Sequence, residues 1–408
     1  MIQIKEKPTS SQQLCIATET TQILKEEGSE RKIYSLVIIM KGYLAYIIFI
    51  IAGILLYTLD FFLLKKHQKT KFIPLLIMLL LFFILATFKS SSVGIDSKTY
   101  ENMYPVIINN GFIDILKKYK LEIGFYGLMY TFAKVGLPYL VFKGFCYFIE
   151  SCFLFLAFQK KDNNVFTLSL LMFIGFLSMS FSALRQGISI AILSFAFSFA
   201  SLEQTQKRKN TINAIIYSIM VIISSTFHAT SIVSLSLFPF FFVKKIGRNT
   251  QILLLISLLI IPRISFAFFT LFSGITGYDY VAYTSRISGR FILYVFVLIA
   301  YIVLKQNSIL NSKFSNYIKP IAENNLDNFT FFMAYLCLIF SSYNTFSQIL
   351  ARMSFYFIYG VVYFISRETS CIIKNKWRFL IEIAIIFVFG LYFLIDTKTL
   401  GIYPYEFI

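Results

Sequence analysis

Charged residues are scarce in this chain of 408 residues, and acidic ones are the scarcest: 20 Asp and Glu stand against 38 Lys and Arg. Histidine occurs twice, and the five cysteines show no metal-ligand or disulfide spacing, so we expect no metal site and draw little from cysteine. The chain contains no Asp-x-Asp and no glycine-rich phosphate loop. These absences argue against a metal-dependent nucleotide-sugar transferase and against ATP coupling, and we expect no cofactor.

Apolar residues are abundant instead. They make up 57% of the chain, aromatic residues 18%, and the mean hydropathy is +0.72. Apolar runs of roughly 17 to 25 residues, the length that crosses a hydrocarbon core, recur along the sequence. A membrane barrel would show alternating strands of about ten residues, and none occur. The fold class is therefore predicted to be an all-α polytopic integral membrane protein.

The spans predicted from these runs number about twelve: 42–60, 72–88, 138–158, 165–181, 184–202, 211–226, 228–243, 251–272, 290–304, 329–345, 351–366 and 378–395. Basic clusters separate alternate spans, at 65–71, 159–161, 206–209, 244–248, 305–319 and 367–378. Assigning these clusters to the cytoplasm gives one consistent path and accounts for the net charge of +18 without a nucleic-acid partner. The path requires that 122–136 does not cross, so we predict a re-entrant or interfacial helix there.

Two regions are expected. Residues 1–39 form a polar tail without the apolar core of a signal peptide, which we interpret as a disordered segment or a misassigned start. Residues 40–408 are expected to form a single membrane domain with two outer loops, 89–121 and 273–289.

Several ionisable or polar residues fall where the predicted path reaches the non-cytoplasmic side: Asp96, Tyr100, Glu122, Arg185, His228, Arg286, Arg290 and Arg352. A charge at bilayer depth costs ~2.5–3.5 kcal/mol on insertion scales, so such residues normally face water or a partner. Arg263 follows Pro262, which predicts a broken helix at that point. Lys143 and Glu150, seven residues apart on one helix, are expected to be a polar pair inside the bundle. We predict that the outer residues line one externally facing cavity.

Simpler explanations remain open for individual residues. Arg185 could extend to the outer headgroups, and His228 could bond a carbonyl at a helix end. Asp96 could cap a short helix. Tyr100 and Tyr104, four residues apart, fit an interfacial aromatic belt as well as a platform for a sugar.

Four stretches occur together in order: "GIDSKTYENMY", "EIGFYGLMY", "LRQGISIAI" and "FHATSIVSL", followed by "LARMSFYF" and "IYPYEF". In these the chain resembles the EpsG family, the Wzy-like polymerases of exopolysaccharide, capsule and O-antigen assembly, over roughly residues 42 to 408. The resemblance implies a multi-pass glycosyltransferase of the bacterial cytoplasmic membrane whose site faces the periplasm or cell exterior. It also implies a fold similar to the C-type glycosyltransferases and a substrate carried on undecaprenyl diphosphate. Possible partners are a chain-length regulator and a flippase of the same pathway, besides the bilayer.

The resemblance maps onto Gly94, Asp96, Glu122, Arg185, Gln186, Phe227, His228 and Arg352. Guanidinium groups bind phosphate oxygens bidentately, so Arg185 and Arg352 are the first candidates for the diphosphate. Arg263, Arg290 and Gln186 are further candidates. The base that takes the acceptor proton is Asp96, Glu122 or His228, and the sequence does not rank them.

Other functions remain open. Another polyprenyl-phosphate-dependent glycosyltransferase or an O-antigen ligase-like enzyme would share the outer cavity, but would make one addition rather than a ladder. A flippase or transporter of lipid-linked glycans would show internal repeats and midplane polar residues. An O-acyltransferase would rest on His228 alone and leave the arginines unexplained.

Overall fold

A computed structural model describes residues 42–62, 72–118, 122–159, 163–200, 207–242, 325–343, 348–372, 375–397 and 401–408, with single residues between 253 and 295. The described residues are helical, and their only extended pairing is an isolated antiparallel bridge between Lys89 and Phe407. The polar tail 1–39, the outer loop 273–289, and Arg263, Arg286 and Arg290 lie outside the described residues, as does the predicted break at Pro262.

Among the described residues, four helices are long and apolar enough to cross a membrane: Gly42–Phe62, α6 (Tyr139–Phe158), the run Asn164–Ser182, and Trp377–Asp396 within α16 (Asn375–Asp396). Five shorter apolar helices in the same part of the chain belong to α2 (Phe72–Phe88), α9 (Leu184–Ala200), α10 (Lys207–Phe227), the 3₁₀ helix Ala229–Phe241 and α13 (Asn325–Ser342). The chain is therefore a helical membrane protein. Neither the count of twelve spans nor a likeness to C-type glycosyltransferases is confirmed, and the predicted spans 251–272 and 290–304 lie mostly outside the described residues.

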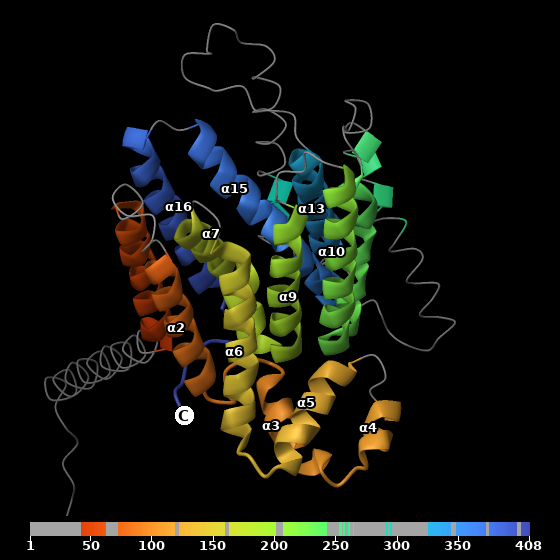
Figure 1. The fold of residues 1–408 in the computed structure, drawn as a ribbon. Helices are drawn as coiled ribbons and strands as arrows, with labels where there is room; N and C mark the ends of the chain where they lie inside the picture. Colours follow the sequence, from red (N-terminus) through yellow and green to blue (C-terminus); the bar gives the residue numbers. More distant parts are fainter. Residues whose placement is uncertain are drawn as a thin grey trace, which may run out of the picture.

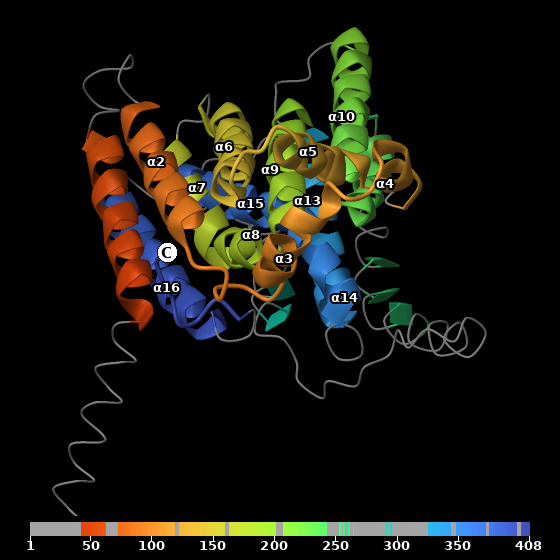
Figure 2. The same ribbon diagram turned by 90° about the horizontal axis from the view of Figure 1, so that it is seen from below.

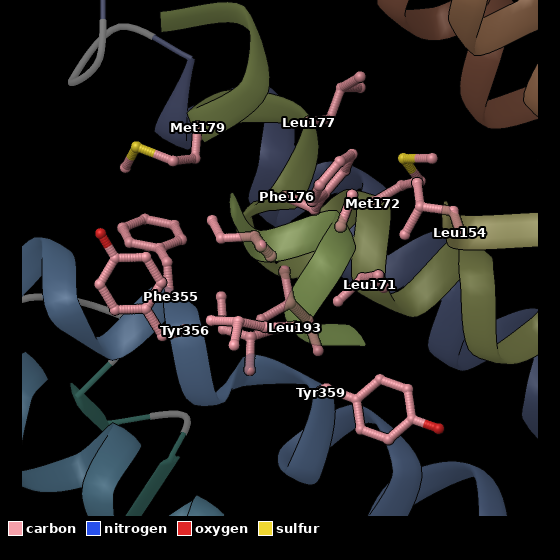
Figure 3. Close-up of a cluster of buried hydrophobic side chains, with 14 of the residues drawn as sticks. Leu154, Leu171, Met172, Phe176, Leu177, Met179, Leu193, Phe355, Tyr356 and Tyr359 are labelled. Carbon is pink, nitrogen blue, oxygen red and sulfur yellow. The ribbon is translucent and has the colours of Figure 1, made fainter. Parts of the chain in front are cut away.

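The run Asn164–Ser182 forms the centre of the bundle. It consists of α7 (Asn164–Leu171), a π-helical turn (Met172–Phe176) and α8 (Leu177–Ser182), and all of it is buried. A helix that is apolar on every side is expected to be surrounded by others. Figure 3 shows Met172 and Phe176 among Leu154 of α6, Leu193 of α9 and Phe355. Since lipid is as apolar as leucine, close van der Waals packing rather than exclusion of water holds these helices together.

Three short helices lie across one end of the bundle: α3 (Ser97–Ile107), α4 (Phe112–Lys118) and α5 (Ile123–Lys134) (Figures 1 and 2). The twelve residues of α5 reach about 18 Å at 1.5 Å per residue, too short for a core of roughly 30 Å. A helix of this length cannot cross such a core by itself, and the re-entrant or interfacial position of 122–136 stays a prediction. The C-terminus lies at the same end (Figure 1). We call this the capped end of the molecule.

The remaining described elements complete the bundle. They are α14 (Gln348–Ala351), the 3₁₀ helix Arg352–Phe357 and α15 (Ile358–Ile372). The 3₁₀ helix packs against α13, and α15 packs against α13 and α7. Helix α10 lies along α9 and contacts α5 at the capped end.

Candidate active site

Five predicted site residues lie at ends of elements. Asp96 precedes α3, Glu122 precedes α5, Arg185 is in the first turn of α9, His228 separates α10 from the following 3₁₀ helix, and Arg352 begins another 3₁₀ helix. Breaks in the backbone cause this placement: Ala183 leaves the helical region between α8 and α9, and His228 is extended. Helix ends carry unpaired backbone groups, which makes them natural places for polar side chains inside a membrane protein.

Glu122 joins two of the predicted residues. Its Oε1 lies 2.6 Å from Nδ1 of His228 and accepts a longer bond, 3.3 Å, from the amide of Ala229. Its other oxygen accepts a hydrogen bond from the Arg185 guanidinium. Burial alone would raise the pKa of Glu122, but the His228 hydrogen bond, the charge of Arg185 and the Ala229 amide hold that pKa below its usual value. The carboxylate is therefore ionised at neutral pH.

Arg185 is held by aromatic side chains from α3 and α5. Its Nε donates to the hydroxyl of Tyr100 at 3.1 Å and its Nη1 to the hydroxyl of Tyr126 at 2.9 Å. Its guanidinium carbon lies 5.5 to 5.9 Å from the ring centres of Tyr100, Phe125 and Tyr126, within cation–π range. The two N–H groups of Nη2 have no partner among the described residues. The side chain is 23% exposed, so Arg185 is not fully enclosed by these partners.

Asp96 and Arg352 form a looser pair. Oδ2 of Asp96 lies 3.9 Å from Nη1 of Arg352, and both side chains are more than a quarter exposed. The Asp96 side chain makes no capping bond to α3, so capping does not explain this residue. Its amide donates to the carbonyl of Ser182 at 3.1 Å. Gln186 is buried, and its amide donates to the carbonyl of Arg352 at 3.0 Å, which ties α9 to the 3₁₀ helix that carries Arg352.

Tyr356 connects the two groups. Its hydroxyl lies 2.6 Å from Oγ1 of Thr230, and its ring centre is 6.4 Å from that of His228. The charges of Glu122, Arg185 and Arg352 all influence this hydroxyl, which indicates that the three residues lie around the same side chain. Sequence reasoning missed Tyr126 and Tyr356. Each follows a predicted charged residue by four positions, and this spacing could have identified both.

The two tyrosines considered for sugar binding serve different purposes in the structure. Tyr100 is buried beneath Arg185, and burial raises its pKa. Tyr104 donates from its hydroxyl to the carbonyl of Leu137 at 2.7 Å and packs against Tyr139 and Phe142. Both rings therefore have protein partners. In the part of the chain that the structure describes, no three His, Cys, Asp or Glu residues gather as a metal site would require.

The fold and the described residues of the site together define a helical membrane protein with a partly exposed polar cluster at the capped end. Two arginines, two carboxylates and a histidine form this cluster. The sequence model of the EpsG family matches residues 72–407, which include every site residue described above. The chain belongs to the EpsG family, which suggests a polysaccharide polymerase and, in general terms, a glycosyltransferase-like enzyme. Searches of curated proteins and of solved structures give no match.

Proposed function

We propose that the protein polymerises polysaccharide at the outer face of the bacterial cytoplasmic membrane. It transfers a growing glycan from undecaprenyl diphosphate onto an acceptor repeat unit that is also lipid-linked. The observation that carries this proposal is the contact of Glu122 with both His228 and Arg185 in a half-open site. This arrangement brings a candidate base beside a candidate phosphate ligand.

His228 is the base in this proposal. An ionised Glu122 can only accept a hydrogen bond, so Nδ1 of His228 carries the proton and in neutral His228 the lone pair lies on Nε2. Nε2 has no hydrogen-bond partner among the described residues, and the side chain is 23% exposed. Glu122 is occupied by three donors and is suited to orienting the imidazole rather than to taking the proton itself.

Arg185 and Arg352 bind the diphosphate. Nη2 of Arg185 offers two donors. Among the described residues, the side chain of Arg352 has a long contact to Asp96, and its backbone carbonyl accepts from Gln186. Donors fixed toward developing charge typically stabilise a transition state by ~2.7–4 kcal/mol each. Gln186 and Asp96 orient Arg352, and Tyr100 and Tyr126 orient Arg185. Arg263 and Arg290 remain candidates outside the described residues.

The step balances without a cofactor. Nε2 of His228 takes the proton of the acceptor hydroxyl, and the hydroxyl oxygen forms a bond to the anomeric carbon of the donor glycan. The bond from that carbon to the diphosphate oxygen breaks, and undecaprenyl diphosphate leaves with the electron pair. Two arginines neutralise the charge on the leaving group, so no strong general acid is needed.

The distribution of basic residues supports an outward-facing site. Helices α6, α9 and α15 end, and α7, α10 and α16 begin, at the end opposite to α3–α5 (Figure 1). The sequence has basic clusters at each of these three junctions. Cytoplasmic loops are enriched in Lys and Arg. About twelve crossings and an arrangement similar to the C-type glycosyltransferases belong to this proposal, as does cooperation with a flippase and a chain-length regulator.

Purified protein in lipid nanodiscs tests the function. It is incubated with an undecaprenyl-diphosphate oligosaccharide repeat unit, a chelator and no nucleotide, and products are resolved by length. A ladder of repeats is expected. A single addition would instead indicate a ligase or single-sugar transferase, and an intact substrate would overturn the enzymatic proposal. The Glu382→Gln variant, changed at the opposite end of the bundle, serves as the matched control.

A further inference from the structure

Two lysines are buried beside the site without contacting it. Lys89, which follows α2, is 1% exposed, and Lys143 of α6 is 4% exposed. Lysine is almost never fully buried unless it is paired. Buried charges within a membrane protein are costly and generally have a function. The chemistry proposed above uses neither residue.

Both lysines donate hydrogen bonds to the segment 89–97, which contains Asp96. Nζ of Lys89 donates to the carbonyl of Val93 at 2.7 Å and to Oγ of Ser97 at 2.6 Å. Nζ of Lys143 donates to the carbonyl of Lys89 at 2.8 Å. An ammonium group can only donate, so the Ser97 oxygen accepts from Lys89 and its proton remains available for the carbonyl of Val93 or Phe181.

The C-terminal residues hold the other side of this segment. The amide of Ser90 donates to the carbonyl of Glu406 at 2.7 Å, and the amide of Gly94 donates to the carbonyl of Gly401 at 2.8 Å. Gly94 has a φ of +102°, and an added Cβ would meet the carbonyl oxygen of Phe181 at 2.2 Å. The segment is therefore fixed between the C-terminus and α8, with the ammonium groups inside the turn.

We propose that Lys89, supported by Lys143, is a positioning residue that keeps Asp96 in place to orient Arg352. Ser97 is the next residue after Asp96, so the bond from Lys89 to Ser97 acts within one residue of the carboxylate. The role of Asp96 in orienting Arg352 rests on the proposed function. The hydrogen bonds between Lys89 and this segment are observed independently of that function.

Lys89 lies among other ionisable groups. Burial and the charge of Lys143 lower the pKa of Lys89 to about 7, and Glu150 of α6 and Glu101 of α3 oppose this shift only in part. Glu150 is fully buried and accepts a bond from Oγ of Ser180 at 2.6 Å. Lys143 and Glu150 thus bond to different partners, Lys89 and Ser180, and the expected direct pair is not among the described contacts.

Hydrogen exchange of the full-length protein in nanodiscs tests the structural half of this proposal. Lys89→Met and Lys143→Met are expected to raise amide exchange in 90–100 about tenfold, because buried hydrogen bonds to this segment are lost. Lys98→Met is the matched control, since Lys98 is exposed and only one residue from Ser97. Unchanged exchange in every buried-lysine variant that accumulates would overturn the proposal, so one folded variant is enough for the test.

A double-mutant cycle tests whether Lys89 acts through Asp96. Lys89→Met is expected to lower kcat/KM for lengthening by about 10–100-fold in the wild-type background, as displaced site groups typically do. In the Asp96→Asn background the same change is expected to cost less than about threefold, because residues that act as a unit are not additive. Equal losses in both backgrounds would mean general destabilisation and overturn the assignment. If wild type lengthens no glycan, the proposed function fails and the exchange result still decides the contact.

Discussion

Each end of the bundle places a glutamate beside an arginine, and the two pairs differ in how completely they are enclosed. At the end opposite to the cap, Glu382 of α16 is fully buried. It is bonded by Asn163 at 2.7 Å, Thr369 at 3.0 Å and Arg378 at 3.1 Å, and also by the hydroxyl of Tyr57. At the capped end, Glu122 is 16% exposed and its partners Arg185 and His228 are each 23% exposed.

The difference separates a stabilising ion pair from a reactive one. Four donors, from Asn163, Thr369, Arg378 and Tyr57, converge on the Glu382 carboxylate, so the group serves to join α16 to α7 and α15. Around Glu122 two nitrogen atoms, Nε2 of His228 and Nη2 of Arg185, have no hydrogen-bond partner among the described residues, and all three side chains are partly exposed. A buried charge is costly in both places. Of these two clusters, the one at Glu122 is the more accessible to a substrate, because its carboxylate is 16% exposed whereas that of Glu382 is fully buried.

The largest expected effect is at His228. Loss of a general base typically lowers the rate by about 10²–10⁴-fold, so His228→Asn is expected to lower kcat for lengthening by that factor. Asparagine can keep a hydrogen bond to Glu122 but offers no basic nitrogen. The measurement is the rate of ladder growth in nanodiscs, with thermal stability followed in parallel. Wild-type ladders from a stable variant would remove His228 from the mechanism.

Substitution of Arg185 is expected to have the second-largest effect on kcat. Arg185→Ala removes the guanidinium that bonds Glu122, Tyr100 and Tyr126, and a donor of this kind is worth about 10²–10³ in kcat. Single-unit glycolipid should accumulate in cells while the protein inserts normally. The control is Arg378→Ala, which removes an arginine from the Glu382 cluster and should affect stability instead. Normal chain length with Arg185→Ala would contradict its binding of the diphosphate.

Substituting the two glutamates tests the comparison directly. Glu122→Gln is expected to lower kcat/KM about 10–100-fold with little change in stability, as when a group that orients a catalytic histidine is altered. Glu382→Gln is expected to leave kcat/KM within a few-fold and to lower the free energy of unfolding by ~1–3 kcal/mol, since a saturated buried acceptor becomes mismatched. Activity in lipid and thermal unfolding are measured for both variants. If the two variants lose stability to the same extent, the clusters at Glu122 and Glu382 would both be structural, and the comparison would be wrong.

Sequence reasoning reached the membrane fold and most of the described site because composition and lipid impose strong constraints. Apolar runs predict helices, and a charge at a helix end within lipid needs an explanation, which singled out Asp96, Arg185 and His228. Sequence reasoning could not predict which of these side chains contact one another. That Glu122 rather than Asp96 meets Arg185 depends on how α3 and α5 lie across the bundle, which no local pattern encodes. The same is true of Lys89, which sequence alone would assign to the end of a span.

The smallest expected effect comes from the packing of α5, which carries Glu122 at its start. An added Cβ at Gly124 would meet Oγ1 of Thr226 at 2.4 Å, two residues before His228, whereas one at Gly127 would meet nothing within 4 Å. Gly124→Ala should therefore push α5 away from α10 and lengthen the contact between Glu122 and His228. Because the shift is a fraction of an ångström, a loss of a few-fold in kcat/KM is expected, well below the ~100-fold that a 1 Å misplacement can cost. Gly127→Ala lies on the same helix and should leave kcat/KM unchanged. Equal kinetics for the two alanine variants would mean that the distance between Glu122 and His228 does not limit the reaction.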